Sequence, residues 1–167
     1  MKTEIYKVET PLQIQTVAEI AEIVWHETYD PILPEGQTEY MIEQFQSAEA
    51  VQKQLDEKGY IYFLLCCDDR DAGFFALVSN EAGSEMMLSK IYLLKEFRGK
   101  GGVKKAFDFI KSTAENRKLK RIWLTVNKEN IHAQNVYRHF GFDICGKQTA
   151  DIGQGYVMDD YLMELIL

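Results

Sequence analysis

The sequence has little of the material from which disulfide-stabilised or metal-dependent folds are built. Its 167 residues include only three cysteines and three histidines. Cys66 and Cys67 are adjacent within an apolar run, where neighbouring residues of a strand point to opposite faces. We therefore expect all three cysteines, Cys145 included, to be small buried hydrophobic residues in a reducing compartment. The histidines show no metal-ligand spacing, so the sequence predicts no metal site.

Long apolar runs are also missing. No run approaches the roughly 20 residues that a membrane-spanning helix requires, so we expect no membrane association. Residues 1–4 lead into an alternating segment without the apolar core of a signal peptide, which favours a cytoplasmic protein. No linker, low-complexity stretch or internal repeat divides the chain, and its length is typical of one domain, residues 1–167.

The charge is unevenly distributed along the chain. Residues 1–89 contain 5 Lys and Arg against 17 Asp and Glu, whereas residues 90–121 contain 11 against 3. A basic window in a protein of net charge −7 indicates a local anionic ligand, although a solvated basic helix face explains most of those lysines equally well. Because the remainder of the chain is acidic, we expect no nucleic-acid partner.

Hydrophobic periodicity and turn residues predict the order of the elements. Alternating or continuous apolar segments predict strands at residues 3–8, 60–67, 72–79, 84–94, 121–126, 142–150 and 156–166. Helical spacing and caps predict helices at residues 11–27, 37–46, 48–58, from 103 onward, and at 130–140. Antiparallel strands mixed with strand–helix–strand units predict an α+β or mixed α/β layered fold.

A glycine-rich loop, Arg98 to Gly102, joins a strand to a helix. Unsatisfied backbone N–H groups and the helix dipole favour an anion at such a junction, and glycines let the main chain approach a phosphate closely. The loop matches neither a Walker A motif nor a GxGxxG fingerprint. Taken alone, it is consistent with a phosphate site or with a plain tight turn.

A second segment, residues 123–142, favours the phosphate interpretation. Together the two segments resemble the GNAT acetyltransferase superfamily. Its cofactor motif, Arg/Gln-x-x-Gly-x-Gly/Ala after a long strand, is similar to the segment from Arg98 to Gly102. Its later motif is Asn-x-x-Ala-x-x-x-Tyr-x-x-x-Gly-Phe. All five of its positions are matched here, by Asn130, Ala133, Tyr137, Gly141 and Phe142.

The resemblance implies a mixed, mostly antiparallel sheet flanked by helices, with acetyl-CoA as co-substrate in a gap between two splayed strands. Main-chain groups of Ile91, Tyr92 and Leu93 would hold the pantetheine and the acetyl carbonyl. Asn130 would contact the pantetheine arm, or else simply cap its helix; for Asn127 we favour a turn-shaping role. The pyrophosphate would lie against the loop and helix start, at Arg98, Gly99, Lys100, Gly101, Gly102, Val103 and Lys104.

The resemblance also implies the chemistry. A neutral primary amine of a small molecule or peptide would attack the thioester directly, and the phenol of Tyr137 would protonate the departing thiolate. On its apolar helix, Tyr137 would otherwise be interpreted as a core aromatic residue. The alternative function is a CoA-binding or regulatory module that has lost turnover, and a more distant one is a different phosphate-binding protein.

Two positions depart from the family pattern. Val103 replaces the usual small residue, where it either crowds the pyrophosphate or, as we favour, faces the core. Ser89 lies about where related enzymes carry a glutamate base, and Glu85 lies farther up the strand, so we assign no general base.

The acceptor site would be covered by the first helices, as the resemblance implies. We expect Trp25, His26 and Tyr29 to form one wall of it, or otherwise to belong to the core and its rim. Carboxylates crowd the following loop and would attract a cationic amine such as a polyamine. The family also suggests a homodimer.

Overall fold

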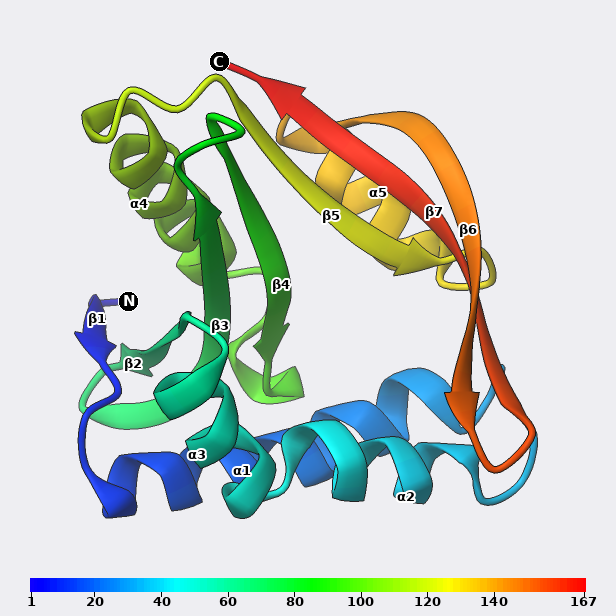
Figure 1. Ribbon diagram of the computed structural model, residues 1–167. Helices are drawn as coiled ribbons and strands as arrows, with labels where there is room; N and C mark the ends of the chain where they lie inside the picture. Colours follow the sequence, from blue (N-terminus) through cyan, green and yellow to red (C-terminus); the bar gives the residue numbers. More distant parts are fainter. The chain divides into compact units, whose positions relative to one another are not determined.

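The computed structural model describes residues 1–167 (Figure 1). The helices are α1 (Pro11–Tyr29), α2 (Gln37–Met41), α3 (Ala48–Glu57), α4 (Gly102–Asn116) and α5 (Ile131–His139), with a π-helical turn η1 (Ile42–Gln46) and a 3-10 turn η2 (Lys95–Phe97). The strands are β1 (Thr3–Lys7), β2 (Tyr60–Cys67), β3 (Arg70–Asn80), β4 (Glu85–Leu93), β5 (Arg121–Asn127), β6 (Asp143–Gly153) and β7 (Tyr156–Ile166). The predicted order of strands and helices is confirmed.

The strands form one sheet in the order β1-β2-β3-β4-β5-β7-β6. The pairs β1–β2, β2–β3, β5–β7 and β6–β7 are antiparallel. The pair β4–β5 is parallel, with Glu85–Met87 opposite Arg121–Trp123, and α4 supplies the crossover that a parallel pair needs. The predicted fold class, a mixed and mostly antiparallel sheet flanked by helices, is therefore confirmed.

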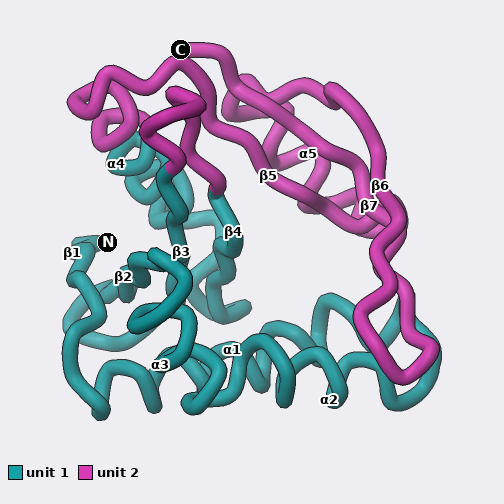
Figure 2. The backbone as a smooth tube through the Cα atoms, viewed as in Figure 1, with its two compact units in different colours: residues 1–79, 88–110 teal, residues 80–87, 111–167 magenta.

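The chain divides into two compact units, coloured separately in Figure 2. Unit 1 comprises residues 1–79 and 88–110, and unit 2 comprises residues 80–87 and 111–167. The boundary falls within β3, β4 and α4, so each unit is described by itself below. The single domain expected over residues 1–167 stays a prediction.

Unit 1 opens with a helix whose start is set by local sequence. Thr10 Oγ1 accepts a hydrogen bond from the Gln13 N–H at 3.2 Å, and Gln13 Oε1 accepts one from the Thr10 N–H at 3.0 Å. This capping box, with Pro11 in the first turn, satisfies donors that a helix start leaves unpaired. The predicted cap and apolar stripe of α1 are thus confirmed.

The helix expected at residues 37–46 is wrong in its second half. It ends as α2 at Met41 and continues as the π-helical turn η1. The Phe45 carbonyl accepts hydrogen bonds from Gln54 Nε2 at 2.8 Å and from Lys90 Nζ at 3.1 Å. Side chains that compete for a helix carbonyl disturb the regular hydrogen-bond ladder, which accounts for the irregular turn.

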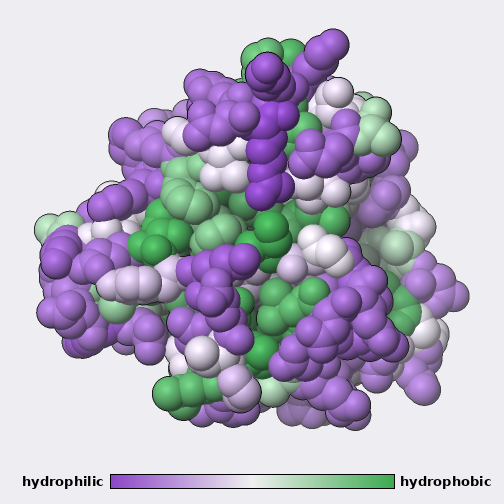
Figure 3. Space-filling model, turned by 60° about the vertical axis from the view of Figure 1, so that its left-hand side comes forward, coloured by the Kyte–Doolittle hydropathy of each residue, from purple (hydrophilic) through white to green (hydrophobic).

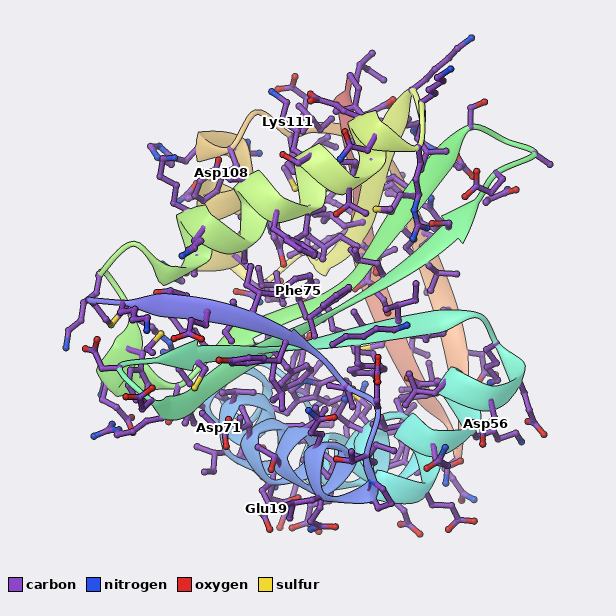
Figure 4. All side chains as sticks on the ribbon, turned by 90° about the vertical axis from the view of Figure 1, so that its left-hand side faces the viewer. Glu19, Asp56, Asp71, Phe75, Asp108 and Lys111 are labelled. Carbon is purple, nitrogen blue, oxygen red and sulfur yellow. The ribbon has the colours of Figure 1, made fainter.

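Successive residues of the unit 1 strands face opposite layers, as the pleat requires. Phe63 and Phe75 stack at 5.0 Å and pack against Phe109 of α4 on one face (Figure 4). Phe74 lies on the other face, 5.8 Å from the Tyr92 ring, where α1 and α3 pack. Unit 1 therefore has two aromatic layers, and its β4 side chains alternate between them.

The expectation of three buried cysteines holds for one of them. Cys67 is buried, Cys66 is half-buried and Cys145 is exposed, and all three thiols are free. Cys145 lies on β6, the outermost strand of the sheet, where one face of the strand is open to water. Residue type alone could not distinguish an edge strand from a central one.

Unit 2 is built on the antiparallel strands β5, β7 and β6, with α5 inserted between β5 and β6. Its core contains Phe142, Met163, Ile122 and Leu124, all nearly or fully buried. The hairpin between β6 and β7 turns at residues 153–155, whose three φ angles are all positive. The predicted Gly-Gln-Gly turn is confirmed, because two of its three residues are glycines that adopt this conformation freely.

The surface is largely hydrophilic on the face drawn in Figure 3, with apolar residues gathered in patches between the charged ones. None of the helices combines the length and the apolar character that crossing a bilayer demands.

Candidate active site

The glycine loop of unit 1 has the conformation that its composition predicts. After β4 the chain makes the unexpected 3-10 turn η2, and α4 begins at Gly102. Gly99 and Gly101 have φ angles of +73° and +88°, which other residues adopt only with strain. A Cβ atom at either position would meet nothing within 4 Å. The loop is therefore open on the side where these glycines expose the main chain.

The basic side chains around the loop are mostly held by the protein. Arg98 donates from Nε to the Leu93 carbonyl at 2.9 Å and from Nη2 to Glu27 Oε2 at 3.0 Å. Lys104 Nζ pairs with Asp108 at 2.7 Å, one turn along α4, whereas Lys100 is exposed. Arg98 thus braces the loop against β4 and α1, a role that sequence spacing did not predict.

Val103, the departure from the family pattern, is half-buried. Its neighbours along the helix, Gly102, Ala106 and Phe107, are buried, as the predicted apolar stripe requires. Val103 therefore lies at the edge of that stripe, partly covered by the core and partly exposed.

The end of β4 brings predicted cofactor and acceptor residues together in unit 1. The hydroxyl groups of Tyr92 and Tyr29 share a hydrogen bond at 2.9 Å, and the Trp25 ring lies 5.9 Å from that of Tyr92. Trp25 is 5% exposed, and its Nε1 makes no hydrogen bond within the protein. Gly73 of β3 makes the strand approach possible, because a Cβ there would lie 2.3 Å from the Tyr92 carbonyl oxygen.

His26 does not join this aromatic group. Its Nδ1 lies 2.8 Å from Asp30 Oδ2 and its Nε2 lies 3.4 Å from Glu22 Oε1. The hydrogen bond with Asp30 raises the pKa of the imidazole. Of the three predicted acceptor residues, Trp25 and Tyr29 therefore share one wall with Tyr92, whereas His26 belongs to the acidic rim of α1.

Lys90 forms a polar cluster that the sequence did not reveal. Its Nζ donates to Tyr62 Oη at 2.9 Å, to the Phe45 carbonyl at 3.1 Å and to Gln54 Oε1 at 3.2 Å. None of these acceptors carries a charge. Burial lowers the pKa of Lys90 to about 7. The only signal in the sequence is a lysine inside an otherwise apolar strand.

In unit 2, the asparagines at the end of β5 shape a turn and a helix start. Asn127 Oδ1 accepts from the Glu129 N–H at 2.9 Å, and Asn130 Oδ1 accepts from the Ala133 N–H at 3.2 Å. Gln134, which is buried, donates from Nε2 to the carbonyls of Asn127 and Lys128. The predicted turn and cap roles are confirmed, while a contact of Asn130 with the pantetheine stays a prediction.

Tyr137 lies on α5 and is half-buried, with its ring 6.1 Å from that of Phe142. The helix ends just beyond it, where Gly141 has a φ of +97° and the Phe142 N–H bonds the Tyr137 carbonyl at 3.0 Å. This ending positions Phe142 in the core and leaves the phenol at the edge of the apolar layer. No group of three His, Cys, Asp or Glu side chains in residues 1–167 is arranged to hold a metal ion.

Comparison with known proteins gives one family. The model of the Acetyltransferase (GNAT) family matches residues 17–142. An uncharacterized N-acetyltransferase of Mycobacterium bovis is 33% identical over 96 residues, which are 58% of this chain and 60% of that protein. The spermine/spermidine N(1)-acetyltransferase of Bacillus subtilis is 38% identical over 61 residues, 36% of this chain and 40% of that enzyme. The chain thus aligns with three-fifths or less of the length of these relatives.

A likeness to solved structures supports the fold along the whole chain. The N-acetyltransferase of Thermoplasma acidophilum, solved in complex with coenzyme A, superposes with a TM-score of 0.77. It is 20% identical, and the match covers 100% of both chains.

Proposed function

The chain belongs to the Acetyltransferase (GNAT) family, which uses acetyl-CoA as co-substrate, and on that premise we propose that it acetylates a primary amine of a small molecule or peptide. The observation that carries this proposal is the loop between β4 and α4. There two glycines with positive φ expose main-chain N–H groups at the start of a 15-residue helix. That arrangement suits a pyrophosphate.

The residues present fit CoA. The N–H groups from Gly99 to Lys104 hold the pyrophosphate, and Lys100 adds an exposed positive charge. The main chain of β4 from Ile91 to Leu93 holds the pantetheine and the acetyl carbonyl, and Asn130 contacts the pantetheine arm. When bound, acetyl-CoA supplies an acetyl group activated as a thioester.

Catalysis proceeds by direct attack in a ternary complex. The neutral amine attacks the thioester carbonyl, and main-chain donors stabilise the oxyanion. Tyr137 gives its phenolic proton to the departing sulfur. A phenol of ordinary pKa near 10 stays protonated at neutral pH, so it can donate to a thiolate whose conjugate thiol has a pKa near 8.5.

The acceptor lies against Trp25, Tyr29 and Tyr92. The unpaired indole N–H of Trp25 offers a donor to an acceptor molecule, and the aromatic faces suit a cationic chain. His26 lies among carboxylates that attract such a cation. The Bacillus subtilis relative acts, by its name, on spermine and spermidine, so a polyamine is the first acceptor to test. A homodimer and a cytoplasmic location remain predictions.

The test is release of free thiol from acetyl-CoA by the purified chain with polyamines, amino acids and peptides. We expect turnover with at least one polyamine. CoA binding without thiol release across the whole panel would favour the alternative, a CoA-binding or regulatory module. Thermal stabilisation by a nucleoside triphosphate but not by CoA would contradict both.

A further inference from the structure

Asp160 is a buried carboxyl group that the proposed chemistry does not yet use. It lies on β7 in unit 2, opposite Asn127 of β5 and Gln148 of β6. Residues opposite each other in antiparallel strands point to the same face, so the carboxyl group is flanked by an amide on each side. Only 7% of the residue is exposed.

One oxygen of this carboxyl group, Oδ1, accepts no hydrogen bond from the protein. The donors around it are engaged elsewhere. Lys128 Nζ pairs with Asp159 Oδ1 at 2.8 Å, and Gln134 Nε2 bonds the Asn127 and Lys128 carbonyls at 3.1 and 2.9 Å. Buried acceptors of this kind are rare because they are costly, and they often mark a site that receives a donor from outside the chain.

The electrostatic surroundings favour a proton acceptor. Burial raises the pKa of Asp160 to about 6, the adjacent Asp159 carboxylate raises it further, and Lys128 opposes the shift. Lys147 on β6 lies nearer to Asp159, whose pKa it helps to lower. A carboxyl group with these neighbours is mostly ionised at neutral pH, yet is a stronger base than an exposed aspartate.

Asp160 is tied to the segment that leads into the candidate catalytic helix. Its register partner Asn127 accepts through its carbonyl from the Asn130 N–H at 2.9 Å, and Asn130 caps the helix that carries Tyr137. The Lys128 N–H bonds the Asp159 carbonyl at 3.1 Å. The carboxyl group is therefore held at the same turn as the residue proposed to contact the pantetheine arm.

Other carboxylates considered as bases are already paired. Glu85 binds Arg121 at 2.7 Å, Glu27 binds Arg98 at 3.0 Å, and Asp30 binds His26. Ser89 offers only a hydroxyl group. Among these groups, Asp160 alone combines burial with an oxygen that no protein donor reaches.

We infer that Asp160 receives the ammonium group of the acceptor and removes its proton before attack, an assignment that rests on the proposed acetyl transfer. One proton passes from nitrogen to a carboxylate oxygen, and the neutral amine then forms the N–C bond as the C–S bond breaks. Tyr137 protonates the sulfur and recovers its proton from the nitrogen of the new amide. Asp160 returns its proton to solvent after product release.

The experiment compares the full chain with Asp160→Asn and with the matched control Asp159→Asn, which removes the neighbouring exposed carboxylate. With an amine that the wild type acetylates, kcat/KM of wild type should fall on the acid side with an apparent pKa near 6. Asp160→Asn should lower kcat/KM by about 10²–10⁴-fold and abolish that acid limb, with unchanged CoA affinity. The control should retain most of the activity and the limb.

Two further measurements separate a base from a structural residue. An acceptor whose amine is already neutral at the assay pH should lose far less rate in Asp160→Asn, because no proton needs removal. Independently of any variant, the carboxyl ¹³C resonance of Asp160 should shift when the amine is added to the complex of wild type with CoA. Equal loss with both kinds of amine, or no shift of that resonance, would overturn the assignment.

The failures are distinguishable. If wild type acetylates an amine and Asp160→Asn does so at the same rate with the same pH profile, the assignment is wrong and the proposed function stands. If wild type releases no thiol with any amine of the panel, the proposed function itself is wrong, and this assignment falls with it.

Discussion

Replacing Lys90 by methionine should make the stability of the protein less dependent on pH. Lys90 donates three hydrogen bonds to uncharged acceptors, and burial lowers its pKa from the ordinary 10.5 to about 7. Between these values the unfolded chain holds a proton that the folded chain has released. The free energy of unfolding of wild type therefore rises with pH above 7, by at most about 1.4 kcal/mol per pH unit, and is insensitive to this group below pH 7.

The methionine variant lacks this titration, so its stability relative to wild type should decrease as pH rises. Because Lys90 is half-buried and solvent screens part of the penalty, we expect the difference to fall by about 1–2 kcal/mol between pH 7 and pH 9. The substitution leaves no acceptor orphaned. Tyr62 Oη still accepts from Gln46 Nε2 at 3.3 Å, and the Phe45 carbonyl still accepts from Gln54 Nε2.

Urea unfolding at pH 7, 8 and 9, followed by tryptophan fluorescence, measures both free energies. Lys53→Met, at an exposed position on α3, is the matched control, with an expected change below about 0.5 kcal/mol. A difference between Lys90→Met and wild type that stays constant from pH 7 to pH 9 would refute the reasoning, because it would show that the folded protein keeps the Lys90 proton.

Three further predictions concern the glycines and the proposed acid. Gly101→Ala should lose about 1 kcal/mol of stability at a φ of +88° and should also weaken CoA binding, measured by calorimetry. Gly59→Ala, at a φ of +70° away from the loop, is expected to lose similar stability with CoA affinity intact. Tyr137→Phe should slow turnover by about 10²–10⁴-fold with little change in the Kd of CoA; an unaltered rate removes the phenol from the mechanism. Gly73→Ala should cost more than about 2 kcal/mol, because its Cβ would lie 2.3 Å from the Tyr92 carbonyl oxygen; a normal unfolding midpoint would contradict that close approach.

Local sequence determined those parts of the protein that depend on neighbours along the chain. The capping box at Thr10, the cap at Ser47 and the loop glycines at 99 and 101 are all visible as residue types at fixed spacing. Their physics is local, since caps and positive φ angles involve only a few consecutive residues. The family motif at Asn130 and Tyr137 is equally local, which is why the fold and the cofactor could be inferred together.

Only the tertiary structure decided how charged and polar side chains are partnered. The pairing of Arg98 with Glu27 joins residues 71 positions apart, and the Lys90 cluster draws on three separate segments. Cys145 and Cys67 have the same side chain, yet one is exposed and the other buried.

The same distinction applies to Asp160. In the sequence it is one of two adjacent aspartates with nothing to tell them apart. On the strand, Asp159 is exposed and pairs with Lys128, while Asp160 points to the opposite face and is buried without a donor for one oxygen. The pleat assigns neighbouring residues to opposite faces, but only strand pairing decides which face is covered. Sequence therefore determined the family and its motifs, and tertiary packing determined which carboxyl group is available to act as a base.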